Sequence, residues 1–144
     1  MRKLLVNERM TRDPITISSE AFLSAACRLF EDNDIRRLPM IDDGKLVGIL
    51  TWSDMRAALP FGATSFAIFG QDHPVAKMLV SQSMTPDPIA VTPITTIDHA
   101  AQIMLQHKIS GLPVVLDDKM IGIITASDIL RILVTETAGW SARI

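Results

Sequence analysis

The chain has 144 residues, of which 48% are hydrophobic and 21% charged, with a formal net charge of −2. This composition indicates a globular protein, and the lack of a basic excess argues against nucleic acid as the main partner. The N-terminal apolar run is too short for a signal peptide, and no stretch reaches the roughly 20 apolar residues of a membrane span. The single cysteine, Cys27, excludes an internal disulfide, so we expect a cytoplasmic protein.

One sequence pattern occurs twice in the chain. The stretch "GILTWSD" at 48–54 returns as "GIITASD" at 122–128, an offset of 74 residues (122 − 48). The same offset aligns residues 10–59 with residues 84–133, with 17 identities and no gap. Such self-similarity predicts a tandem repeat. We expect a first repeat at 1–59, a helical linker at 60–83 and a second repeat at 84–144.

Each repeat predicts a short strand followed by a helix. The Pro-containing "DPI" leads into extended segments at 15–17 and 89–91. Ser18 or Ser19 is expected to cap the first helix, and Thr95 or Thr96 to begin the second. Helical spacing then gives each helix one apolar face. These faces comprise Phe22, Ala26, Leu29 and Phe30, with Cys27 in or near the core, and Ile97, Ala100, Met104 and Leu105.

A hairpin and a closing helix complete each predicted repeat. "LPMI" and "KLVGIL" flank Asp42-Asp43-Gly44, and the second copy has Asp117-Asp118 in the same place. The closing helices begin at Thr51 and Thr125. A three-stranded sheet with helices on one face cannot bury its apolar surface alone. We therefore expect an α/β fold of the α+β type, with two β-α-β-β-α repeats packed as a pseudo-two-fold pair through small mixed sheets.

The order "MTxDPI", "LPxh" (h being apolar) and "GhhTxSD", found in both halves, resembles a tandem pair of cystathionine-β-synthase (CBS) domains, a Bateman module. The stretch between the repeats is similar to that of stand-alone bacterial pairs and of the CBS part of acetoin-utilisation CBS–ACT proteins. The resemblance implies a regulatory dimer, not an enzyme, that binds adenosine compounds in clefts between its repeats. Because the chain ends soon after the second repeat, we expect it to regulate a partner protein in trans.

The Thr-x-x-Asp spacing places a hydroxyl and a carboxylate on one face at a helix start. An ionised carboxylate accepts hydrogen bonds and can take two from the vicinal hydroxyls of a ribose. Deoxyribose has only one of these two hydroxyls, so such a site should prefer ribonucleotides. The alternative is plain helix capping, with Thr at the N-cap and Asp three residues later. Both roles are compatible at Thr51–Asp54 and at Thr125–Asp128.

By position, the resemblance implies two unequal ligand sites. Thr51, Ser53 and Asp54 would hold one ribose, with its phosphates toward Arg36 and Arg37, which are otherwise an exposed pair balancing nearby acidic residues. The other ribose would meet Thr125, Ser127 and Asp128, beside the uncharged Ser110-Gly111. The residues expected to frame the bases are Thr95, Ala100, Ile109, Ser110 and Gly111 for the first site, and Ala21, Ala26 and Ile35 for the second.

Several further expectations concern ligands and partners. The ligand would be AMP, ADP, ATP, NAD or S-adenosylmethionine, and no cofactor is required. The three histidines have no spacing typical of a metal site, so we assign no metal. Trp52 is expected to pack rather than to contact ligand. The uncharged "PFGATSFAIF" at 60–69 favours a homodimer contact over folding back on its own module. The competing function is a structural or interaction pair with empty clefts.

Overall fold

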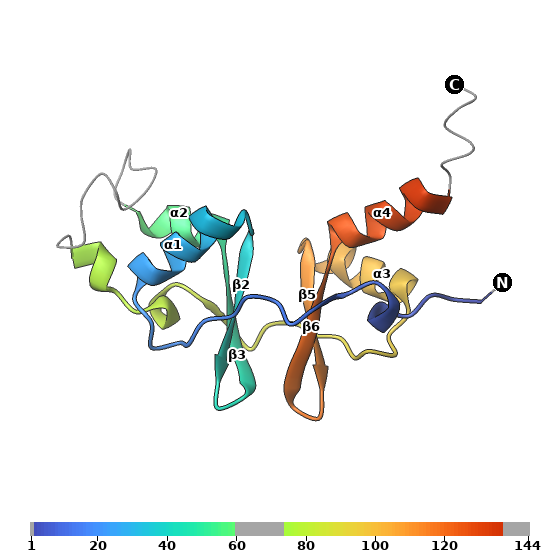
Figure 1. Cartoon of the computed structure of the whole chain (residues 1–144), viewed down its shortest axis with the longest axis horizontal. Coiled ribbons are helices and arrows are strands. Elements are labelled where there is room, and N and C mark those ends of the chain that lie inside the picture. Colours follow the sequence, from blue (N-terminus) through green and yellow to red (C-terminus); the bar gives the residue numbers. More distant parts are fainter. Residues whose placement is uncertain (1, 60–73, 137–144) are drawn as a thin grey trace, which may run out of the picture. The chain divides into compact units, whose positions relative to one another are not determined.

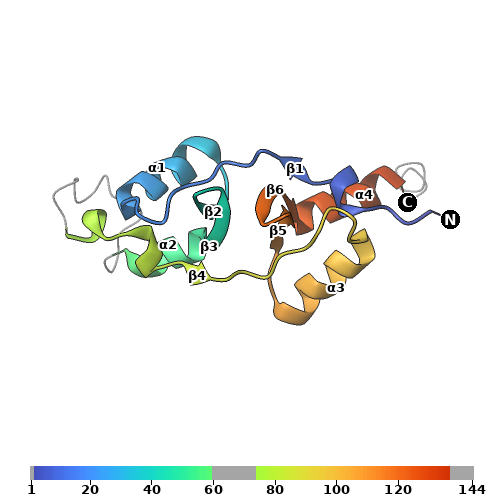
Figure 2. The ribbon, with the colours of Figure 1, turned by 90° about the horizontal axis from the view of Figure 1, so that it is seen from below.

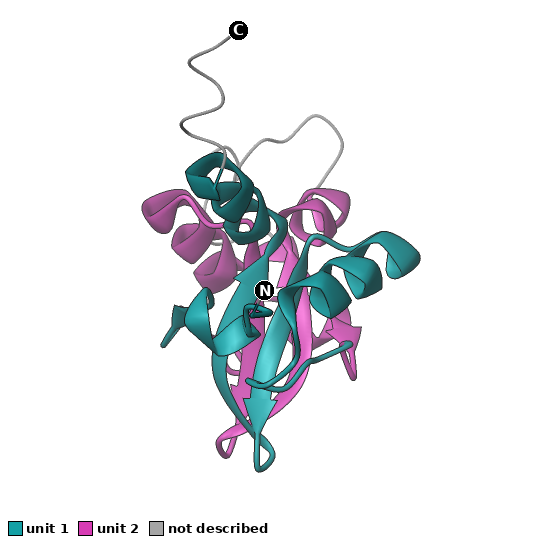
Figure 3. Cartoon of the chain, turned by 90° about the vertical axis from the view of Figure 1, so that its right-hand side faces the viewer, with its two compact units in different colours: residues 1–14, 89–144 teal, residues 15–88 magenta. Residues whose placement is uncertain are grey.

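The computed structural model describes residues 2–59 and 74–136 (Figure 1). The chain divides into two compact units, each with a hydrophobic core of its own (Figure 3). Unit 1 consists of Met1–Pro14 and Ile89–Ile144, and unit 2 consists of Ile15–Pro88. Each unit therefore contains the body of one repeat and the segment that leads into the other.

Unit 2 is built on an antiparallel hairpin covered by helices. Strand β3 pairs with β2 on one side and with the short β4 on the other, and a parallel bridge joins Ile17 to Met40 of β2. The elements are α1 (Leu23–Asn33), β2 (Arg37–Asp42), β3 (Lys45–Thr51), α2 (Trp52–Ala58), the 3-10 helices η3 (Pro74–Lys77) and η4 (Val80–Gln82), and β4 (Thr85–Pro86).

Unit 1 repeats this arrangement. Strand β6 pairs with β5 and with the short β1, and a parallel bridge joins Val91 to Val114 of β5. The elements are η1 (Val6–Glu8), β1 (Thr11–Arg12), α3 (Ile97–His107), β5 (Gly111–Leu116), β6 (Lys119–Thr125) and α4 (Ala126–Glu136). The predicted β-α-β-β-α order is thus confirmed, with the first strand of each repeat reduced to one bridge in a small mixed sheet.

The hairpin turns follow from their sequences. Asp43 and Gly44 have φ of 52° and 78°, and Asp117 and Asp118 have φ of 51° and 65°. Two central residues with positive φ are what a type I′ turn requires, and its twist matches that of the flanking strands. The predicted hairpins are confirmed in both repeats.

The segments at 4–12 and 78–86, here called the leading segments, each pack on the body of the other repeat. The Val6 N–H donates to the Thr95 carbonyl at 2.8 Å, and the Val80 N–H donates to the Ala21 carbonyl at 2.9 Å. Figure 2 shows the consequence, with β1 beside β6 and β4 beside β3. The offset of 74 residues therefore extends upstream of the matched motifs and relates these contacts to each other.

The leading segments explain the glycine of the "GhhTxSD" motif. A Cβ on Gly122 would lie 2.7 Å from Met10 Sδ and 2.8 Å from the Thr11 carbonyl oxygen. A Cβ on Gly48 would likewise collide with Met84 Sδ. Only glycine lets the methionine and the following strand approach the hairpin this closely.

Two predictions about the first helices are wrong. Neither Ser18 nor Ser19 caps α1, because Phe22 holds the N-cap position and Ser19 donates its N–H and hydroxyl to the Asp42 carboxylate. On α3, Leu105 is 79% exposed although we expected it on the apolar face. Thr96 caps α3 as predicted, accepting the His99 N–H at 3.3 Å.

The cores contain most of the residues that periodicity selected, but the prediction is also wrong for Phe22, which is 50% exposed at the N-cap of α1. Cys27 is buried in unit 2 with Ala26 and Phe30, and Ala100 and Met104 are buried in unit 1. Trp52 packs edge-on against Phe30, with ring centroids 5.6 Å apart, as the packing interpretation predicts. No helix in the described part of the chain is long and apolar enough to cross a membrane.

Candidate functional site

The Thr51–Asp54 turn joins β3 to α2 in unit 2. Thr51 is the N-cap of α2; its hydroxyl accepts the Asp54 N–H at 3.1 Å, and Asp54 Oδ2 accepts the Thr51 N–H at 3.0 Å. This reciprocal pair is a capping box, so the capping role is confirmed. Asp54 is half-buried, and no other described residue donates to its carboxylate. Asp54 Oδ1 accepts no hydrogen bond from the described residues.

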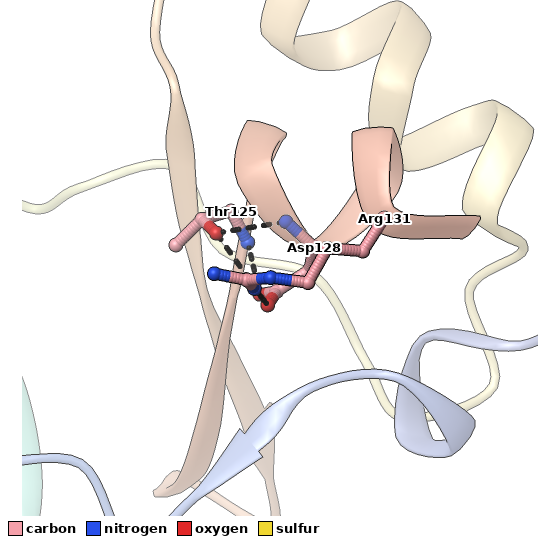
Figure 4. A network of polar contacts seen from close by, with 3 residues as sticks. All are labelled: Thr125, Asp128 and Arg131. Atoms are coloured by element: carbon pink, nitrogen blue, oxygen red, sulfur yellow. Dashed lines mark hydrogen bonds and ion pairs between the residues drawn. The ribbon is translucent and has the colours of Figure 1, made fainter. Parts of the chain in front are cut away.

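The Thr125–Asp128 turn has the same capping bonds and two more (Figure 4). Asp128 Oδ2 accepts the Thr125 N–H at 2.9 Å and the Thr125 hydroxyl at 3.0 Å. Arg131 Nη1, one helical turn further along α4, donates to Asp128 Oδ1 at 2.8 Å. Asp128 is the only charged residue among those that the structure describes as buried, at 9% exposure.

Each turn lies beside the segment that precedes "LP". In unit 2, Arg37 pairs with Thr51 across the hairpin, and the Trp52 N–H donates to the Arg36 carbonyl at 2.8 Å. Arg36 is exposed and Arg37 is half-buried. The hairpin register therefore brings the predicted ribose and phosphate residues of the first site into one neighbourhood.

The same register operates in unit 1, with different chemistry. Gly111 pairs with Thr125, and the Ala126 N–H donates to the Ser110 carbonyl at 2.9 Å. The neighbourhood that holds two arginines in unit 2 thus has an exposed serine and a glycine here. Positive charge at this turn comes instead from Arg131 on α4.

The remaining predicted residues differ in how much surface they offer. Ser53 and Ser127 are exposed on the first turns of α2 and α4. Thr95 is half-buried, and its hydroxyl accepts the Thr92 N–H at 3.1 Å. Ile109 packs at the edge of the unit 1 core, whereas Ala100 has no exposed surface. Their predicted contact with an adenine base stays a prediction, as does that of Ala21, Ala26 and Ile35.

Sequence reasoning missed Arg131. The signal was available, because Arg131 follows Asp128 by three residues and such pairs face each other on a helix. The 74-residue offset also marks the position as different, since it relates Arg131 to Ala57.

Among the described residues, no group of three or more His, Cys, Asp or Glu side chains is placed to hold a metal ion.

The motifs, the paired β-α-β-β-α units and the twin Thr-x-x-Asp turns define a CBS domain pair. The sequence profile of the CBS domain matches residues 6–60 and 77–135. The chain therefore belongs to the CBS domain family.

Relatives include both short proteins and long enzymes. A CBS domain-containing protein of Dictyostelium discoideum is 33% identical over 138 residues, covering 92% of each chain. An inosine-5′-monophosphate dehydrogenase of Korarchaeum cryptofilum is 40% identical over 119 residues, which are 82% of this chain but 22% of that enzyme. The chain thus spans about a fifth of the dehydrogenase.

Solved structures of CBS pairs are also similar. An acetoin utilization protein of Vibrio cholerae has a TM-score of 0.79 and 30% identity, covering 98% of both chains. The CBS pair of protein MJ0100, in complex with 5′-methylthioadenosine and S-adenosyl-L-methionine, has a TM-score of 0.77 and 30% identity over 94% of this chain and 99% of that one. The protein CBSX2 in complex with AMP has a TM-score of 0.78 and 27% identity over 93% and 98%.

Proposed function

We propose that this chain is a regulatory module that binds an adenosine-containing ligand through its ribose and modulates a partner protein in trans. The observation that carries the proposal is the open Asp54 carboxylate, fixed by the Thr51 cap and next to two arginines. The vicinal hydroxyls of a ribose donate to Asp54, which has unused acceptor capacity. Ligands in the structures of MJ0100 and CBSX2 support the adenosine class.

Phosphate groups on the ligand are recognised by Arg36 and Arg37. Guanidinium groups match phosphate oxygens in geometry and in charge. This chemistry favours AMP, ADP, ATP or NAD at the Asp54 site over a ligand without phosphate. S-Adenosylmethionine has no phosphate and is cationic at its sulfur, so its carboxylate is the one group that can pair with these arginines.

The ligand leaves the module chemically unchanged. The groups proposed to contact the ligand are the Thr51–Asp54 capping box and the two arginines. In this proposal the carboxylate accepts hydrogen bonds from the backbone and the ribose, and the arginines bind phosphate. Sustained ATP hydrolysis by purified protein, lost in Asp54→Ala, would contradict this part of the proposal.

The experiment that tests ligand binding is a thermal-shift panel with AMP, ADP, ATP, NAD and S-adenosylmethionine, followed by calorimetry on those that stabilise. A ligand at 100 times its Kd adds about 2.7 kcal/mol to the free energy of unfolding. The matched control is 2′-deoxy-AMP against AMP, since it removes one ribose hydroxyl and keeps the base and phosphate. No stabilisation by any of the five ligands would overturn the proposal.

A structural or interaction pair without a physiological ligand is the second candidate function. The contacts of Asp128 favour it for one of the two turns, because that carboxylate already has partners from its own repeat. The panel separates the two functions, since an interaction pair gains no stability from nucleotides.

We also propose a homodimer. The uncharged segment at 60–69 that motivated this prediction lies outside the described residues. Apolar side chains on the described surface give additional support: on α4, Leu130, Leu133 and Val134 are 59%, 56% and 68% exposed. Light scattering at micromolar concentration should give about twice the 15.8 kDa of one chain. A mass of 15.8 kDa would contradict the dimer.

A further inference from the structure

The two Thr-x-x-Asp turns differ in how much of the carboxylate is already used. A carboxylate offers about four lone-pair positions to hydrogen-bond donors. Asp54 accepts one hydrogen bond from described residues, the Thr51 N–H. Asp128 accepts three, from the Thr125 N–H, the Thr125 hydroxyl and the Arg131 guanidinium. A ribose diol needs two acceptor positions, which Asp54 has open and Asp128 does not.

Arg131 holds the oxygen that a ribose would use. Capping uses Oδ2 in both repeats and leaves Oδ1 for other donors, and in unit 1 Arg131 Nη1 lies 2.8 Å from that oxygen. The Asp128 side chain is 10% exposed and that of Arg131 is 73% exposed. The more exposed guanidinium therefore lies directly against the buried carboxylate, and Figure 4 shows the two groups in contact.

The first repeat has no such group. The position equivalent to Arg131 is Ala57, an exposed residue of α2. A methyl group cannot donate a hydrogen bond, so Asp54 keeps its Oδ1 open. The two turns thus differ at this position of the repeat, in addition to the arginines that precede "LP" in unit 2 only.

We propose that Arg131 is an internal competitor for ribose, and that it makes the Asp128 turn the weaker of two ligand sites. The inference rests on the proposed function, because it assigns a specificity residue to the same ribose sites. A ligand must displace the guanidinium from Asp128 Oδ1 before its hydroxyls can donate there. Because the pair is exposed on its arginine side, the expected penalty is about 1.5- to 5-fold in affinity, equivalent to about 0.2–1 kcal/mol.

The test uses adenosine, whose lack of phosphate removes any attraction to Arg131. In an Asp54→Ala background, which leaves the Asp128 site to be measured alone, Arg131→Met should tighten adenosine about 1.5- to 5-fold by calorimetry, because methionine has no hydrogen-bond donor. Raising the salt concentration should tighten adenosine binding in the protein that keeps Arg131, because salt screens the ion pair. The same change should leave adenosine affinity unchanged in the Arg131→Met protein.

The reciprocal variant needs no change at either aspartate. Ala57→Arg in the otherwise unchanged chain should weaken adenosine at the Asp54 site by a similar factor, with Ala57→Met as the control for side-chain size because methionine has no donor. Weaker adenosine binding in Arg131→Met would make Arg131 a ligand contact and overturn the proposal. Unchanged affinity in both Arg131→Met and Ala57→Arg would also overturn it. Failure of every variant and of the parent chain to bind any adenosine ligand would reject the proposed function itself.

Discussion

The two units share their backbone but not the chemistry at the start of the closing helix. Strands β2 and β5 have six residues each, β3 and β6 have seven, and α1 and α3 have eleven. Both closing helices begin with a Thr-x-x-Asp capping box. Around these boxes, however, unit 2 has Arg36 and Arg37, whereas unit 1 has Ser110 and Gly111, and Asp128 pairs with Arg131 of α4.

The comparison separates two kinds of residue. Those shared by the repeats, such as the turn aspartates, the glycine under the leading segment and the capping threonine, determine the backbone. Those that differ change the charge and the hydrogen-bonding groups around each turn. A duplicated fold can therefore have two non-equivalent sites, and the variants below test how far they differ.

The largest difference is expected between Asp54→Ala and Asp128→Ala. Asp54→Ala removes the open carboxylate and should weaken AMP, ATP and adenosine about 10- to 150-fold at the tighter site, since hydrogen bonds to charged groups contribute about 1.5–3 kcal/mol. Asp128→Ala should change the ligand affinity of that tighter site by no more than about twofold. Calorimetry on both variants decides the assignment. If Asp128→Ala abolished the tighter site and Asp54→Ala left its affinity unchanged, the tighter site would belong to Asp128 instead.

The next largest effect concerns the stability of the fold at Gly48 and Gly122, where the leading segments pack against the hairpins. Gly122→Ala places a Cβ 2.8 Å from the Thr11 carbonyl oxygen, so the backbone must shift, whereas Gly48→Ala leaves 3.1 Å to the Thr85 carbonyl oxygen. Overpacking costs about 1–3 kcal/mol, and we expect Gly122→Ala at the upper end of that range. Chemical denaturation measures both.

A second-site change sharpens this test. Met84→Ala should restore most of the stability lost in Gly48→Ala, because the methionine is the main obstacle there. Met10→Ala should restore less in Gly122→Ala, because the Thr11 carbonyl remains. Equal rescue in the two repeats would contradict the difference between them.

Local sequence signals predicted most of the backbone. The Asp-Gly and Asp-Asp turns, the Thr96 cap and the two capping boxes each depend on residues within a few positions of one another. The motif at Thr51–Asp54 could likewise be placed beside Arg36 and Arg37, because a tight hairpin fixes the register of its strands. The hairpins and the capping boxes therefore followed from short-range chemistry, whereas the assignment of Arg36 and Arg37 to phosphate came from the resemblance to the family.

The sequence-based predictions failed where contacts between residues far apart in the chain determine the local structure. The serines before α1 bond to Asp42, which lies 23 and 24 positions away, so a local capping rule could not assign them. The sequence comparison began at residues 10 and 84, so it did not reveal the leading segments or the repeat on which each one packs. Arg131 was missed for a different reason: its spacing from Asp128 was readable, but the repeat comparison stopped at the shared residues.

Arg37→Ala should weaken ligands according to their charge. The loss of one charge-assisted contact should reduce AMP and ATP affinity about tenfold, equivalent to about 1.4 kcal/mol, and leave adenosine within about twofold. The matched gain-of-charge variant is Ser110→Arg in the other repeat, which should strengthen ATP over adenosine at the Asp128 site. Equal weakening of ATP and adenosine by Arg37→Ala would assign this arginine to the hairpin rather than to phosphate.

The smallest expected effect is at Asp42, where the repeats differ again, since the equivalent residue is the half-exposed Leu116. Hydrogen bonds from the Ser19 hydroxyl, then from the Ser19 N–H and the Ser18 hydroxyl, lower the pKa of Asp42 below its ordinary 3.8. A lowered folded-state pKa stabilises the fold at pH values above 3.8, and this contribution is lost as the pH falls through the folded value.

Asp42→Asn should therefore lower the unfolding temperature slightly at pH 7, and the gap to the parent chain should close as the pH falls below 3.8. Asp43→Asn is the matched control, because it changes the neighbouring aspartate, and Asn tolerates the positive φ of 52° at that position. Thermal unfolding monitored by circular dichroism between neutral and acidic pH measures the gap for both variants. A gap for Asp42→Asn that persists unchanged in acid would mean that the serines stabilise the turn through its shape, because the charge of Asp42 would then contribute nothing.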